Sequence, residues 1–203
     1  MKKIVCLMLA LLMLASVAVA ESPSKTVADL NKFTVSTEGQ GSENATLGIV
    51  DTAETSETLP EYEEAVATCE KEIEKLAEGG NVAEYFGEVT DAEGNAVDLK
   101  EKLGVATDDL LNVFEFCPMV ASGFEEGCGA VTVNMQFATA YEEGQKVLVL
   151  IGLISEENGA ESIAWKAFDG ESVNGGIQVE LPEEIIMQIQ NGKALMAVVS
   201  IGK

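Results

Sequence analysis

The sequence predicts an α+β protein: an antiparallel, β-sandwich-like C-terminal half with one short crossover helix, preceded by a helix and hairpin portion. Three observations support this prediction. Apolar and polar residues alternate along residues 131–137, as in a strand with one buried face. Residues 147–154 are apolar on both faces, which predicts a central strand with a layer on each side. Apolar residues at helical spacing occupy an earlier segment, residues 62–76.

The composition divides the chain into four segments. Residues 1–20 are predicted to be a secretory signal peptide, because Lys2 and Lys3 precede an apolar run that ends in small residues up to Ala20. Residues 21–59 form an acidic, partly flexible segment with apolar patches that can make short edge strands. Residues 60–107 are the helix and hairpin portion, and residues 108–203 are the antiparallel β-rich domain.

The clearest helix begins after Thr58, which is a predicted N-cap, with Pro60 in the first turn. Its apolar face includes Cys69 and Leu76, and the glycines at 79 and 80 end it. The opposite face is rich in glutamate and lysine, which is typical of a solvated surface.

Residues 86–90 and 96–99 flank a polar turn and predict a hairpin, followed by a helical turn that ends at Gly104. Residues 114–121 predict a further strand. Proline cannot donate a backbone hydrogen bond, so Pro118 favours an edge position for it.

We interpret residues 131–137 and 147–154 as a core hairpin joined at residues 140–144. Period-two alternation predicts two more half-buried strands, around Trp165 and Val179. Pro182 opens a short helix that Gly192 ends, and residues 195–201 form a final apolar strand.

The absence of two residue types restricts the chemistry. The chain contains no histidine, and all 12 basic residues are lysine. This excludes Ser-His-Asp and Cys-His catalysis, histidine-ligated metals and arginine clamps on phosphate. We therefore expect no enzymatic activity and no cofactor.

The net charge of −23 restricts the partners. Such a field repels nucleic acid and anionic membrane surfaces. Because no second apolar stretch follows the signal peptide, we also expect no stable membrane insertion after its cleavage.

Three cysteines follow the predicted signal peptide, an odd number that cannot be fully paired within one chain. Cys117 and Cys128 are close in sequence and form a possible disulfide, which would contribute about 2 to 3 kcal/mol. Cys69 lies on the apolar face of its helix and is expected to be a buried thiol.

One loop offers oxygen ligands at nearly alternating positions, which raises the possibility of a calcium site. The EF-hand pattern fails, because Ala96 stands where its glycine is required and Lys102 replaces its bidentate glutamate. A plain turn is the alternative. The four candidate ligands are Asp91, Glu93, Asn95 and Asp98.

These observations favour a secreted or surface-associated, non-enzymatic binding, adhesion or assembly module of bacterial origin. Its ligand is unknown, and a surface protein or a glycan is the expected partner. Two alternatives stay open. A carboxylate-dependent glycan hydrolase needs two acids facing each other about 5 to 10 Å apart, although a chain with one tryptophan offers few aromatic platforms for sugar. A calcium-stabilised surface protein is the other.

Overall fold

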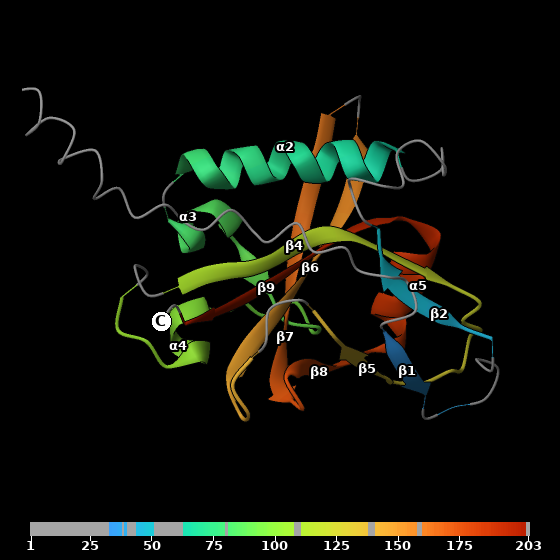
Figure 1. Cartoon of the computed structure of the whole chain (residues 1–203). Coiled ribbons are helices and arrows are strands. Elements are labelled where there is room, and N and C mark those ends of the chain that lie inside the picture. Colours follow the sequence, from blue (N-terminus) through green and yellow to red (C-terminus); the bar gives the residue numbers. More distant parts are fainter. Residues whose placement is uncertain are drawn as a thin grey trace, which may run out of the picture.

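The computed structural model describes residues 33–37, 39, 44–50, 63–79, 81–107, 111–137, 141–157 and 160–201 (Figure 1). Within these ranges the fold is α+β, mostly antiparallel strand, with four helices. The strands are β1 (Thr34–Thr37), β2 (Thr46–Ile49), β3 (Val89–Thr90), β4 (Leu111–Ser122), β5 (Val131–Met135), β6 (Lys146–Glu157), β7 (Ala160–Val173), β8 (Gly176–Leu181) and β9 (Lys193–Ile201). The helices are α2 (Glu63–Gly79), α3 (Val82–Phe86), α4 (Leu99–Leu103) and α5 (Glu183–Asn191).

The strands form one sheet in the order β1-β5-β8-β7-β6-β9-β4-β2, with antiparallel neighbours throughout this order. Strand β3 adds to β7 in parallel at Trp165 and Lys166. The two ends of the order, β1 and β2, contact each other, so the sheet is strongly curled (Figure 1). Both are short strands in the segment 21–59, where the sequence predicted edge strands.

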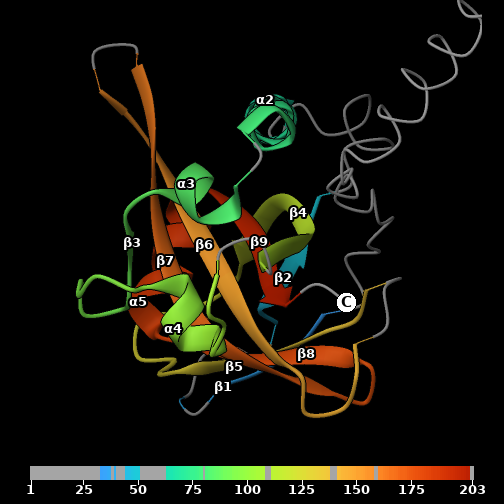
Figure 2. The same cartoon turned by 90° about the vertical axis from the view of Figure 1, so that its left-hand side faces the viewer.

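The two faces of the sheet bury separate apolar clusters. The inner core lies on the concave face and is covered by α5. Met135, Ile151 and Ile186 are completely buried there. The outer core lies between the other face of β4, β9, β6 and β7 and the helices α2, α3 and α4 (Figure 2). Strand β6 contributes alternate residues to each, with Ile151 in the inner core and Leu150 in the outer core. The prediction of a strand covered on both faces is therefore confirmed.

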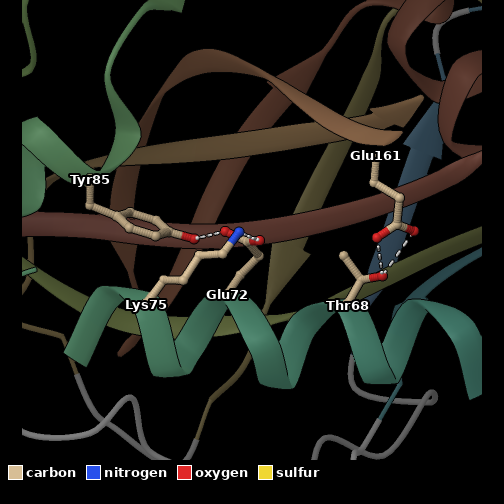
Figure 3. A network of polar contacts seen from close by, with 5 residues as sticks. All are labelled: Thr68, Glu72, Lys75, Tyr85 and Glu161. Atoms are coloured by element: carbon tan, nitrogen blue, oxygen red, sulfur yellow. Dashed lines mark hydrogen bonds and ion pairs between the residues drawn. The ribbon is translucent and has the colours of Figure 1, made fainter. Parts of the chain in front are cut away.

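Two polar contacts attach α2 to the rest of the outer layer (Figure 3). The hydroxyl of Tyr85, on α3, donates to Glu72 Oε2 at 3.0 Å, and Lys75 forms an ion pair with the same carboxylate. Near the other end of the helix, Thr68 Oγ1 donates to Glu161 Oε1 of β7 at 3.3 Å. Because these contacts reach a helix and a strand, they fix the position of α2 over the outer core.

The predicted core hairpin is wrong. Both of its strands exist, but β5 pairs with β1 and β8, whereas β6 pairs with β7 and β9. Consecutive strands do not have to be neighbours, and here β8 and β7 lie between β5 and β6 in the sheet. Period-two alternation identifies the buried face of a strand but not its partner.

The predicted edge position of residues 114–121 is also wrong, because β4 lies between β9 and β2. The Pro118 carbonyl accepts from Val50 N–H at 3.0 Å, so the nitrogen of Pro118 faces the β2 side as well. The paired part of β2 ends at Ile49, opposite Met119. The N–H group that Pro118 lacks would therefore point just beyond the paired end of β2, so no hydrogen bond between β4 and β2 is lost within the paired residues.

Other local predictions are confirmed. Helix α2 ends at Gly79, and α4 ends at Gly104, whose φ of 73° is the left-handed conformation that glycine adopts readily. A small hairpin brings Thr90 opposite Ala96. Helix α5 follows Pro182 and ends before Gly192. The signal peptide and the predicted cap of α2 lie outside the described residues.

Candidate functional site

A groove of about 690 Å³ lies on the outer face of the sheet, beside α4. One wall is α4 itself, through Lys102 and Leu103. Asp98 fixes the start of this short helix by accepting from the backbone N–H groups of Lys100 and Glu101, and Leu103 packs into the outer core. The floor consists of side chains from four adjacent strands: Thr132 of β5, Lys146 of β6, Asp169 and Glu171 of β7, and Gln178 and Glu180 of β8. We call this feature the α4 groove.

One continuous row of polar side chains crosses the four strands of the floor and extends beyond the groove to Asn134. The strand register places Asn134 opposite Gln178, Gln178 opposite Glu171, and Glu171 opposite Lys146. The first pair is hydrogen bonded, with Gln178 Nε2 donating to Asn134 Oδ1 at 2.8 Å. The row therefore changes from amide to carboxylate to ammonium across the sheet.

A second row carries Thr132 opposite Glu180. On β7, Asp169 lies one residue beyond Gly170, the last residue paired with β8 at this end. Lys102 Nζ bonds to Asp169 Oδ2 at 2.9 Å, so an ion pair joins the wall to the floor. This hydrogen bond, together with the carboxylate's charge, raises the pKa of Lys102. Since the two side chains are 44% and 71% exposed, the pair adds little to stability and mainly neutralises charge.

The remaining charges in the groove are not neutralised in this way. In the part of the chain that the structure describes, the side chains of Glu171, Glu180 and Lys146 form no ion pair and no hydrogen bond. All three side chains belong to exposed residues. The groove thus presents two carboxylates and one ammonium group to a ligand.

The residue types in the groove determine what it can do. No aromatic side chain lines it, so it has no platform on which a sugar ring would stack. Its three carboxylates stand side by side on the floor, on β7 and β8, and not on opposed walls. Such a surface can hold a polar, charged ligand by ion pairs and hydrogen bonds.

The predicted calcium ligands lie elsewhere, in the turn between β3 and α4. Asp91 uses both carboxylate oxygens on Asn95, accepting from its backbone N–H at 2.8 Å and from its side-chain amide at 2.9 Å. These hydrogen bonds lower the pKa of Asp91. Asp98 caps α4, and Glu93 is exposed. Within the described ranges no group of three or more acidic or cysteine side chains is arranged to hold a metal ion, and the calcium site stays a prediction.

The three cysteines are present as thiols in this structure. Cys128 belongs to the inner core and Cys117 packs against it, so the predicted disulfide partners face the same cluster. Cys69 lies in the outer core, where burial and the nearby Glu70 and Glu72 raise its pKa to about 12. Burial also raises the pKa of Cys117 well above its ordinary value. Thiols that resist ionisation in this way are poor nucleophiles, and the disulfide stays a prediction.

The inner core also contains buried polar groups. Glu115 is 2% exposed and Ser172 is 1% exposed. Tyr141 is 6% exposed, and its burial and the nearby Glu115 raise the pKa of its hydroxyl. The side-chain oxygens of Tyr141 and Ser172 have no hydrogen-bond partner in the described structure. These groups do not line the α4 groove, and all three are almost completely buried, so we regard the α4 groove as the better candidate site.

Sequence patterns indicated part of the groove. Thr132, Asn134, Gln178 and Glu180 are the polar members of alternating strands, so a wet face was predicted for each strand. The side-by-side placement of β5 and β8, and the position of α4 as a wall, depend on pairings between distant segments. No local signal in the sequence specifies those pairings.

The fold and the groove together define an α+β protein with a sheet-rich core and a charged groove on the outer face of its sheet. Comparison of the chain with known protein families, with curated proteins and with solved structures finds no match. None of the helices in the described ranges has the length and apolar character needed to cross a membrane.

Proposed function

We propose that this protein is an exported, non-enzymatic binding module and that the α4 groove is its contact surface. The observation that carries the proposal is the set of charged groove side chains without partners, Glu171, Glu180 and Lys146, beside two well-packed cores. The strands fix the backbone positions of these charged groups before a ligand binds, so only their side chains lose conformational freedom on binding, which favours a binding role. We also propose that the curled sheet is a sandwich-like arrangement and that the protein acts at a bacterial surface or in the surrounding medium.

A glycan hydrolase is the second candidate, because the groove contains three carboxylates. Asp169 and Glu171 are two residues apart on one strand, which places their Cα atoms about 7 Å apart. The carboxyl groups of glycosidases have similar separations, but they flank the scissile bond from its two sides. Here Asp169 is bound by Lys102, and the acids share one floor. These features favour binding over hydrolysis.

Nuclear magnetic resonance titration tests the proposal. Three probes are added separately to the labelled protein: a peptide of alternating lysine and serine, its glutamate counterpart, and an oligosaccharide derived from cellulose. We expect at least one probe to shift the backbone amide signals of β7 and β8 around Glu171 and Glu180 without being cleaved. If no probe shifts these signals, the groove is not the contact surface. Release of reducing sugar that is lost in Glu171→Gln would instead establish the hydrolase.

The calcium-stabilised alternative has a separate test. The melting temperature of the purified protein is measured with calcium and with a chelator. A higher melting temperature with calcium that disappears in Asp91→Asn would support this alternative, and an unchanged value would exclude it.

A further inference from the structure

We infer that the partner of the α4 groove is a cationic polypeptide segment, bound in an extended conformation with lysine or arginine at alternate positions. This inference rests on the proposed function and names the class of partner. It is argued from the charges of the groove, from the spacing of its carboxylates and from the charge of the whole chain.

The charge of the groove favours a cationic occupant. Lys102 is already paired with Asp169, which leaves Glu171 and Glu180 as two carboxylates against the single ammonium group of Lys146. The whole chain has a net charge of −23, so the long-range field also attracts cations and repels anions. Nucleic acid and anionic lipid are therefore disfavoured as occupants by the same field.

The spacing of the two carboxylates favours an extended chain. Gln178 is the direct partner of Glu171, and Glu180 lies two residues further along β8. Glu171 and Glu180 are thus diagonal neighbours on adjacent antiparallel strands, a relation with about 7 to 8 Å between Cα atoms. Alternate residues of an extended peptide lie on one side of it about 7 Å apart. Two basic side chains at positions i and i+2 therefore match the two carboxylates.

The remaining groups of the groove add specificity. Lys146 lies directly opposite Glu171 across β6 and β7, at the other end of the polar row from Asn134. Its ammonium group disfavours a third basic side chain at that end and favours an acidic side chain or a carboxylate. The expected partner segment therefore has alternating basic residues and a neutral or acidic residue at the end that lies beside Lys146.

The test is a calorimetric titration with the alternating lysine and serine peptide, at low and at physiological salt. The groove variant Glu171→Gln/Glu180→Gln is expected to bind roughly tenfold more weakly, since each exposed ion pair contributes only a modest factor. The control is Glu70→Gln/Glu74→Gln on the exposed face of α2, which removes the same charge at a similar spacing. We expect less than a twofold change for this control.

Two outcomes would overturn the inference. Equal weakening in the groove and control variants would mean that the peptide responds only to net charge. Equal affinity for a peptide with the same lysines in one consecutive block would contradict the alternate spacing. The failure of this inference is distinguishable from that of the proposed function. If the oligosaccharide or the glutamate peptide alone shifts the groove signals, the groove binds but its partner is not cationic, whereas no shift with any probe removes both.

Discussion

Two tyrosines in this protein differ in how their hydroxyl groups are satisfied, and the same substitution should have opposite effects at the two positions. Tyr85 donates to the Glu72 carboxylate at 3.0 Å. The hydroxyl of Tyr141 is buried in the inner core and has no hydrogen-bond partner in the described structure. Replacing either residue with phenylalanine keeps the ring and removes only the hydroxyl.

The expected magnitudes follow from these contacts. Hydrogen bonds to charged groups contribute about 1.5 to 3 kcal/mol, so Tyr85→Phe should lower the free energy of unfolding by about that amount. The Glu72 side chain is 11% exposed, so water replaces the lost donor only in part. A buried hydroxyl without a partner costs about 1 to 3 kcal/mol, so Tyr141→Phe should raise the free energy of unfolding by about 1 kcal/mol.

Urea unfolding measured by tryptophan fluorescence tests both effects. Trp165 is the only tryptophan, is 6% exposed and lies 4.9 Å from the ring of Phe86, so its emission reports the outer core. With a denaturant slope of about 1 to 3 kcal/mol per molar, the midpoints of the two variants should differ by roughly 1 M or more. A loss of stability in Tyr141→Phe would refute the reasoning, because it would mean that this hydroxyl is bonded in solution.

Three further predictions concern packing, pH and redox state. A Cβ at Gly152 would lie 2.7 Å from Trp165 Cζ3, so Gly152→Ala should displace the ring, lower stability by about 1 to 3 kcal/mol and change the fluorescence of the native state. Glu183 accepts from the backbone N–H groups of the 127–129 loop, which lowers its pKa in the folded state. The stabilisation by Glu183 is therefore complete above the ordinary carboxyl pKa of about 4.3 and is lost as the pH falls through the lowered pKa of the folded state. The melting temperature should fall with the pH in this acidic range, and Glu183→Gln should make that fall smaller. The protein purified from an oxidising compartment should contain the disulfide between Cys117 and Cys128, detected as the loss of two hydrogens in the intact mass and as one thiol that remains available after unfolding.

Matched variants separate these effects from general perturbation. Gly79→Ala also adds a methyl group to a glycine, but nothing lies within 4 Å of the added atom, so its stability should not fall. Glu184→Gln removes the neighbouring acid in the first turn of α5. This variant should still lose melting temperature at acidic pH as the unmodified protein does. If Glu184→Gln reduces the loss of melting temperature at acidic pH as much as Glu183→Gln does, the hydrogen bonds between Glu183 and the loop are not the cause of that loss. Three alkylated thiols per chain would contradict the disulfide.

The sequence predicted most of the strands and several helix ends from particular residues. The period-two runs gave β5, β7 and β8, because a side chain on a strand must point to one face or the other, and the apolar run of residues 195–201 gave β9. The long apolar run of β6 indicated cover on both faces, and the structure places Ile151 and Leu150 in different cores. The ends of α4 and α5 followed from Gly104 and Gly192, since glycine is the residue that most readily leaves the helical conformation.

The candidate site could not be predicted from the sequence in the same way. Glu171 and Glu180 are separated by the turn between β7 and β8, and Lys146 comes from β6. Only the strand register makes them neighbours, and the same register separates β5 from β6 although they are consecutive in sequence. Pro118 shows a similar limit, because its tolerance inside the sheet depends on where the short strand β2 ends.

The sequence by itself determined which apolar faces are buried, where several helices end and that chemistry dependent on histidine or arginine is absent, because these features depend on the side chains and on their near neighbours. The tertiary structure decided which strands pair, how the sheet curls and where the charged α4 groove forms. Those features depend on contacts between segments that are distant in sequence, and their free energy is a property of the whole packed chain.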